Sequence, residues 1–89
     1  MEECSFRNVS LVNPAALILL LEDTLRYGFG QIVRAKGVIP VGGELLRFDL
    51  ADGLYAVTGA ADFSGTPQCV FIGRKLAKAA LLSRFTAAQ

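Results

Sequence analysis

The stretch ELLRFDLADGLYAVTG, residues 44–59, carries the clearest structural signal in this sequence of 89 residues. Asp52 and Gly53 lie between two segments rich in β-forming residues, and this pair favours a two-residue type I′ turn because both of its positions adopt a positive φ. The first arm alternates apolar with charged side chains: Leu46, Phe48 and Leu50 against Arg47 and Asp49. Residues 44–59 therefore predict an antiparallel hairpin with one apolar face.

The segment before the hairpin, QIVRAKGVIP (residues 31–40), predicts a strand with two unlike faces, because successive side chains of a strand point to opposite sides of the sheet. One set comprises Val33, Ala35, Gly37 and Ile39, and the other comprises Ile32, Arg34, Lys36 and Val38. We expect Ala35 and Gly37 to let a helix approach closely, and glycine is also compatible with a β-bulge. Arg34 and Lys36 fit either a solvated sheet face or a contact with a partner.

Two apolar segments predict helices. In NPAALILLLEDTLRYG (residues 13–28), Asn13 is a suitable N-cap, Pro14 takes the first helical position and Gly28 ends the helix. Ile18 and Leu19 widen the apolar surface beyond one stripe, so this helix is either well buried or partly covered by something outside the chain. The second helix is expected over residues 75–86.

The remaining segments complete the order β-α-β-β-β-β-α. CSFRNVSLV (residues 4–12) predicts a first strand, and QCVFIG (residues 68–73) predicts a short apolar strand in the middle of the sheet. Strands joined by short turns pair antiparallel, and two helices suffice to cover one face of such a sheet. We expect a single domain over residues 1–89 of the α+β class: a two-layer sandwich with an antiparallel sheet of four to five strands, two helices on one face and a ferredoxin-like architecture. The other sheet face is left without cover from its own chain.

Composition argues against a membrane protein or a polyanion-binding protein. The formal net charge is +1, so the chain lacks the strong electrostatic field that would favour binding to nucleic acid or to an anionic membrane. The longest apolar run, residues 15–21, is far shorter than the ~20 residues of a membrane span, and the start MEEC lacks the basic region of a secretory signal. These features predict a cytoplasmic protein. The hydrophobic share of 53% also hints at apolar surface that packs against a partner.

The sequence offers no constellation for catalysis or metal binding. Histidine, the usual general base and the commonest metal ligand, is absent. Neither a G-x-x-x-x-G-K-[ST] motif for phosphate nor a C-x-x-C motif for a metal occurs. Cys4 and Cys69 lie in apolar segments and are expected to be reduced and buried, with a disulfide as the minor alternative. We predict no catalytic residue, no metal site and no cofactor in this chain.

Two other function classes remain as alternatives. The open sheet face with Arg34 and Lys36 is compatible with a small nucleic-acid-binding platform. Such platforms stack bases on aromatic side chains, which this strand lacks, so nucleic acid ranks second. An enzyme with an unrecognised site would show a buried charged cluster lining a pocket.

Two short motifs carry a resemblance to a known family. RAKG (residues 34–37) lies in the strand after the first helix, and VFIGRKL (residues 70–76) precedes a final helix that ends in Arg84-Phe85. The motifs and the order of elements from Ser5 to Phe85 resemble the C-terminal domain of the CobW-type P-loop GTPases, a family that includes metallochaperones. Full-length members of that family carry a GTPase domain that uses GTP and a divalent metal, zinc or cobalt. They serve in metal insertion, cobalamin biosynthesis or metal homeostasis.

The resemblance implies a non-catalytic accessory domain, either cut from a longer protein or encoded separately, that acts by protein–protein contact. The implied partners are a CobW-type GTPase domain in the same or a separate chain, a client metalloprotein and another copy of this chain, with no membrane partner. The chain departs from the family in lacking a histidine-rich segment and in having Lys75 where an aspartate often caps the last helix.

The candidate residues form two groups. Those expected to contact a partner are Ile32, Arg34, Lys36, Val38 and Arg74. Those expected to be structural are Ala35, Gly37, Asp52, Gly53 and Gly73, with Gly73 in the turn from the last strand to the second helix. For Arg74 the sequence leaves open a surface position or an ion pair with an acid such as Asp49.

Overall fold

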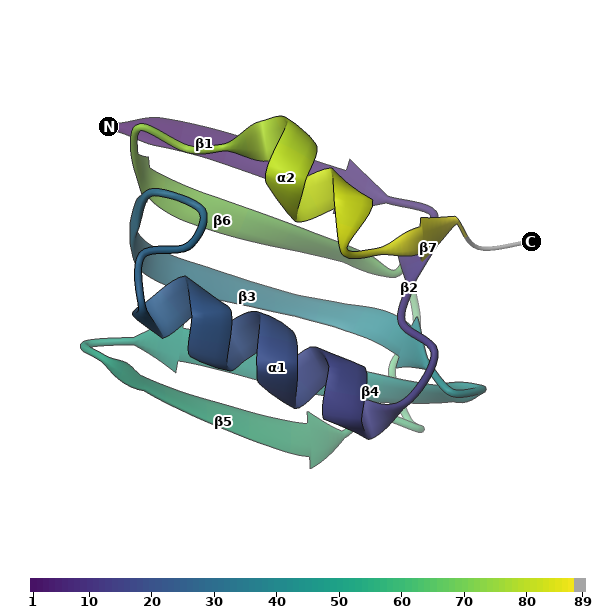
Figure 1. Cartoon of the computed structure of the whole chain (residues 1–89). Coiled ribbons are helices and arrows are strands. Elements are labelled where there is room, and N and C mark those ends of the chain that lie inside the picture. The colour runs from purple at the N-terminus through teal and green to yellow at the C-terminus, as the bar shows by residue number, and fades with distance from the viewer. Residues whose placement is uncertain (88–89) are drawn as a thin grey trace.

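The computed structural model describes residues 1–87. Over these residues the elements are β1 (Glu2–Arg7), β2 (Val9–Ser10), α1 (Pro14–Leu25), β3 (Gln31–Val41), β4 (Glu44–Ala51), β5 (Leu54–Gly59), β6 (Gln68–Arg74), α2 (Lys78–Ser83) and β7 (Thr86–Ala87). Five strands form one sheet in the order β1-β6-β3-β4-β5, and all neighbours pair antiparallel. Both helices lie on one face of this sheet (Figure 1). The predicted two-layer α+β sandwich is thus confirmed. Within residues 1–87, no helix has the length and apolar character needed to cross a membrane.

The connection from β1 to β3 gives the fold its ferredoxin-like character. Since β1 and β3 are each antiparallel to β6, which lies between them, they run parallel to each other. The chain passes from one to the other through α1, which makes a split β-α-β unit. The short strands β2 and β7 pair antiparallel in a second small sheet.

Both hairpins use turns in which the two central residues have a positive φ. The turn from β4 to β5 is formed by Asp52 and Gly53, with φ of 54° and 75°. The turn from β3 to β4 is formed by Gly42 and Gly43, with φ of 60° and 88°. These angles suit the right-handed twist of the flanking strands, so the predicted turn at Asp52-Gly53 is confirmed.

A β-bulge near the start of β3 overturns part of the predicted face pattern. Ile32 pairs with Gly73 of β6, but Arg34 pairs with the next residue, Ile72, so Val33 is an extra residue in β3. Because of this extra residue, the side chains before the bulge point to the face opposite to the one that simple alternation predicts. Ile32 is therefore in the core and only 7% exposed, whereas Val33 is 49% exposed. The prediction that Ile32 shares a face with Arg34 was wrong.

The core fills the space between the sheet and the helices. Leu17, Leu20 and Leu21 of α1 are fully buried. Four phenylalanines meet beside them with neighbouring ring centroids 5.7 to 6.5 Å apart: Phe6, Phe48, Phe71 and Phe85. Such tilted and edge-on ring pairs add to the stabilisation from buried apolar area.

The two helices begin in different ways. In α1 the Ala16 N–H donates to Asn13 Oδ1 at 2.9 Å, which confirms Asn13 as the N-cap. The second helix is shorter than expected, because α2 begins at Lys78 after an N-cap, Ala77, that makes no side-chain hydrogen bond. Ahead of it, the Glu2 carboxylate of β1 accepts hydrogen bonds from the N–H groups of Lys75 and Leu76 at 3.1 and 3.2 Å. A distant acid thus binds the free N–H groups before this helix.

Candidate functional site: the open sheet face

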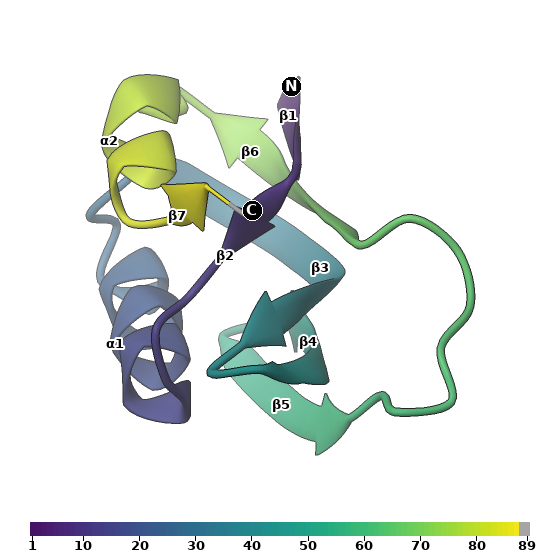
Figure 2. The same cartoon turned by 90° about the vertical axis from the view of Figure 1, so that its right-hand side faces the viewer.

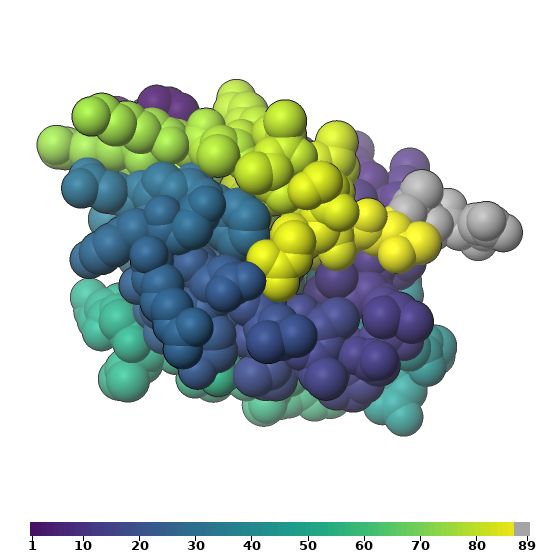
Figure 3. Space-filling view, in the orientation of Figure 1, coloured from purple at the N-terminus to yellow at the C-terminus, as the bar shows by residue number. Residues whose placement is uncertain are grey.

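Within residues 1–87, no helix or strand covers the sheet face opposite the two helices (Figure 2). Figure 2 shows α1 and α2 on one side of the sheet, and on the other side only the loop between β5 and β6. Figure 3 views the helix side, where α1, α2 and the β2–β7 pair form a closed outer surface. We define the uncovered side as the open sheet face.

The strand register arranges the side chains of the open sheet face in three rows. Residues directly opposite each other on neighbouring strands point to the same face. Read from β1 to β5, the rows are Glu3–Ile72–Arg34–Ala51–Leu54, Ser5–Val70–Lys36–Asp49–Ala56 and Arg7–Gln68–Val38–Arg47–Thr58. The middle of the face is therefore mixed: Val70 and Ile72 of β6 and Val38 of β3 are apolar, while Arg34 and Lys36 of β3 lie among them.

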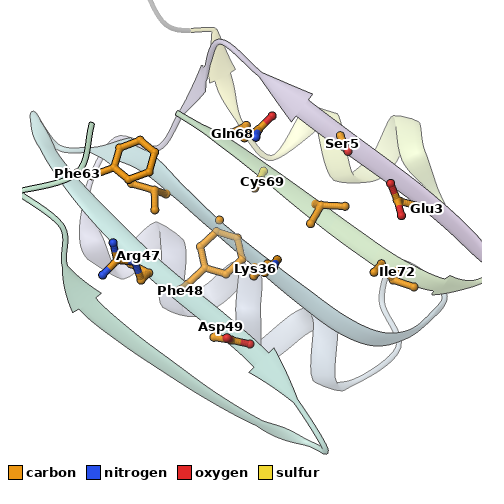
Figure 4. Close-up of a pocket in the computed structure, with 13 residues that line it drawn as sticks. Glu3, Ser5, Lys36, Arg47, Phe48, Asp49, Phe63, Gln68, Cys69 and Ile72 are labelled. Carbon is orange, nitrogen blue, oxygen red and sulfur yellow. The ribbon is translucent and has the colours of Figure 1, made fainter. Parts of the chain in front are cut away.

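A hollow of about 530 Å³ lies over the middle of this face. Figure 4 shows Lys36, Arg47 and Asp49 on its strand floor, and Phe63 from the loop after β5 at one end. Val38 also lines the hollow and is 9% exposed, although it is not part of the helix-side core. The hollow therefore combines an apolar floor with charged side chains.

Cations outnumber acids on the open sheet face. Its rows contain four cations, Arg7, Arg34, Lys36 and Arg47, and two acids, Glu3 and Asp49, all of them exposed. Within residues 1–87, no ion pair forms among these six side chains; the ion pair in this part of the chain joins Asp23 and Arg84 on the helix side. The excess positive charge is therefore available to a partner.

The structure separates the predicted contact residues. Arg34, Lys36 and Val38 lie on the open sheet face, while Ile32 lies in the core. Arg74 is exposed at the end of β6, paired in register with Gln31, and makes no ion pair with Asp49. A role for any of these side chains in a contact stays a prediction.

Several residues of the face were not singled out from the sequence. Val70 and Ile72 could have been found, because they alternate with the buried Cys69 and Phe71 in QCVFIG. Phe63 gave no such signal, since it comes from an irregular loop whose path depends on tertiary contacts.

Contacts between strands account for two of the small residues, Gly37 and Gly73. Ala35 is 1% exposed, on the helix side. A Cβ on Gly37 would collide with Cys69 of β6, so the neighbouring strand by itself accounts for glycine there. The expected close approach of a helix to Ala35 and Gly37 stays a prediction. Gly73 lies inside β6, where a Cβ would collide with the backbone of Gln31 and Ile32 at the bulge. The prediction that Gly73 belongs to the turn was wrong for that reason.

The cysteines and acids of the described chain offer little chemistry. Cys4 and Cys69 are free and buried, as predicted. Burial raises the pKa of the Cys69 thiol to about 12, with a smaller contribution from the nearby Cys4, so it stays protonated at neutral pH. In residues 1–87, no three cysteine or acidic side chains come together as ligands for a metal ion. The residues present therefore do not fit a zinc or cobalt site.

A comparison with protein-family models matched residues 1–89, the whole chain, to the cobalamin synthesis protein cobW C-terminal domain. The chain belongs to the cobW C-terminal domain family. The resemblance carried by RAKG and VFIGRKL is thus confirmed. A search of curated proteins found no match.

Solved structures support the fold of this cobW C-terminal domain. It is similar to the Zn(II)-bound YjiA GTPase from E. coli, with a TM-score of 0.72 and 19% sequence identity. A Zn(II)-bound triple mutant of YjiA GTPase gives the same values. In both cases the match covers 93% of this chain and 28% of the other. The chain therefore spans little more than a quarter of the length of these GTPases.

Proposed function

We propose that this cobW C-terminal domain is a non-catalytic accessory domain of a CobW-family GTPase, and that it acts by docking its open sheet face on a GTPase domain in the same or a separate chain. The observation that carries the proposal is the open sheet face itself, which exposes Arg34 and Lys36 beside a partly apolar hollow, with no ion pair to either of them from residues 1–87. A surface that combines apolar residues with unneutralised cations suits a partner that supplies both apolar contact and carboxylates.

The cellular role follows the family. We propose that the complex serves metal insertion, cobalamin biosynthesis or metal homeostasis, with a client metalloprotein as a further partner. GTP and the divalent metal are assigned to the GTPase domain, because this chain has neither a phosphate-binding motif nor, in its described part, a metal-ligand cluster. A location in the cytoplasm stays a prediction.

The double variant Arg34→Glu/Lys36→Glu tests the docking face. We expect its affinity for a separately expressed CobW-type GTPase domain, measured by isothermal titration calorimetry, to fall about tenfold or more, since two attractive contacts become repulsive. The melting temperature should fall only slightly, because both side chains are exposed and the one new repulsion within residues 1–87 is between residue 36 and Asp49, opposite it on β4.

The matched control is Arg26→Glu/Lys78→Glu, which makes the same change in charge at exposed positions on the helix side. The control should bind like the unchanged chain. Equal affinity for both double variants would refute docking through the open sheet face.

A further inference from the structure

The outer edge of β5 is an unprotected edge strand. In the described part of the chain, no strand pairs with β5 on the side away from β4, and Figure 1 shows no helix or strand beyond it. Its six residues, LYAVTG, include neither a charge nor a proline, and its pairing with β4 has no bulge. Natural sheets normally carry such features at their edges because a bare edge pairs with other chains. The opposite edge strand, β1, has three charged residues in six: Glu2, Glu3 and Arg7.

The hairpin register identifies the backbone groups that are free on this edge. Ala51 and Leu54 flank the two-residue turn and exchange backbone hydrogen bonds, as do alternate pairs after them. The N–H and C=O groups of Leu54, Ala56 and Thr58 therefore point toward β4. Those of Tyr55, Val57 and Gly59 point outward and are available to another strand.

Apolar side chains flank the edge on both faces. On the open sheet face, Leu54 is 74% exposed. On the helix side, Tyr55 and Val57 are only partly buried against the core. Ile18 of α1 is 38% exposed. It lies about 140° around the helix from Asp23, whose carboxylate accepts a hydrogen bond from Arg84 at the end of α2. It therefore lies on the side of α1 that faces away from α2, toward β5. An added strand would cover apolar surface in both layers.

We propose that β5 pairs antiparallel with β5 of a second copy of this chain, around a two-fold axis perpendicular to the sheet at Ala56. This register sets Tyr55 opposite Val57 of the other copy on the helix side, and Leu54 opposite Thr58 on the open sheet face. It uses the free backbone groups of Tyr55 and Val57. An aromatic residue opposite a β-branched one is a favourable cross-strand pair.

A second copy fits this edge because the edge complements itself. The two-fold operation keeps both helix layers on the same side, so the two sheets continue as one and the helix layers adjoin. The charges of the open sheet face end at β4, and β5 itself is uncharged. No like charges therefore meet directly across the new strand pair. The surface is distinct from the one in the proposed function, because it uses the strand edge and leaves the middle of the face free.

Charge variants at the two-fold axis test this pairing. Sedimentation velocity over a range of protein concentrations would compare the unchanged chain with the variants Ala56→Lys and Ala56→Glu. We expect the unchanged chain to show a monomer–dimer equilibrium and each variant alone to dimerise at least tenfold more weakly, because two like charges face each other at the axis. An equimolar mixture of the two variants should recover the dimer.

Ser5→Lys and Ser5→Glu are the matched controls, since Ser5 is exposed in the same row of the face but on the opposite edge strand. They should dimerise like the unchanged chain, and so should Arg34→Glu/Lys36→Glu, whose defect concerns the GTPase domain. Circular dichroism checks that every variant is folded. A chain that stays monomeric at all concentrations, or a mixture of the Ala56 variants that stays monomeric, would overturn the proposal.

Discussion

At the scale of single residues, the close approach between strands limits the choice of side chain most strongly. Gly37 has a backbone conformation open to any residue, since its φ is not in the positive range, yet no Cβ fits against Cys69 of the neighbouring strand. Gly59, at the end of β5, has no atom within 4 Å of the position its Cβ would take. The two glycines thus differ in the space available for a Cβ and form a pair for comparison.

Gly37→Ala is expected to lower the free energy of unfolding by about 1–3 kcal/mol, because β3 and β6 must separate to admit the methyl group. Gly59→Ala should change it by less than about 0.5 kcal/mol. Urea denaturation of both variants measures the difference. Equal stability of the two variants would show that contact between strands is not what holds glycine at position 37.

The buried thiol of Cys69 predicts a loss of stability in alkali. Its pKa is about 12 in the folded chain against 9.0 for the free group. Below pH 9.0 the thiol is protonated in both states, and above it the unfolded chain loses the proton while the folded chain keeps it. This group therefore makes the free energy of unfolding fall by up to about 1.4 kcal/mol per pH unit between the two values.

Denaturation of the unchanged chain and of Cys69→Ala at pH values across that window isolates this contribution, since the other titrating groups are common to both. The unchanged chain should show the steeper fall. Parallel slopes would contradict a buried, protonated thiol.

At the scale of elements, different parts of the chain hold the segments in which the two helices begin. Asn13 caps α1 from the adjacent position, whereas the N–H groups before α2 bind Glu2, more than seventy positions away in sequence. Helix α1 is therefore stabilised locally, and the start of α2 requires the folded sheet.

Asn13→Ala removes the acceptor of the Ala16 N–H and should lower the free energy of unfolding by about 1 kcal/mol. Asn13→Ser, which keeps a capping oxygen, should lose much less. Thermal unfolding followed by circular dichroism compares the two. A drop of the same size in both variants would argue that the cap is unimportant.

The elements also show which features follow from local sequence. The turn at Asp52-Gly53, the N-cap at Asn13 and the alternation in β4 depend on neighbouring residues, and all were predicted. The bulge at Val33 and the hydrogen bonds of Glu2 to the segment before α2 arise from strands and loops distant in sequence, so local patterns could not indicate them. The same distinction explains the site: Arg34, Lys36 and Val38 were placed together correctly, while Ile32 was misplaced and Phe63 was missed.

At the scale of the whole molecule, the two sides of the sheet are unequal. On the helix side, Arg84 donates to Asp23 at 2.7 Å and its guanidinium lies 5.5 Å from the centroid of the Phe29 ring. These contacts link the C-terminal ends of both helices over the core. The open sheet face has neither a covering layer nor an ion pair among its charged residues in the described chain, so this side is the one we assign to a partner.

The helix layer is the rival docking surface, because Leu19 and Leu82 are 59% and 50% exposed there. The two surfaces are distinguished by titrating the ¹⁵N-labelled chain with an unlabelled CobW-type GTPase domain and following each amide signal by NMR. We predict that shifts and broadening concentrate at Lys36, Val38 and Val70 on the open sheet face. Changes confined to residues around Leu19 and Leu82, with the signals of the open sheet face unaltered, would contradict it.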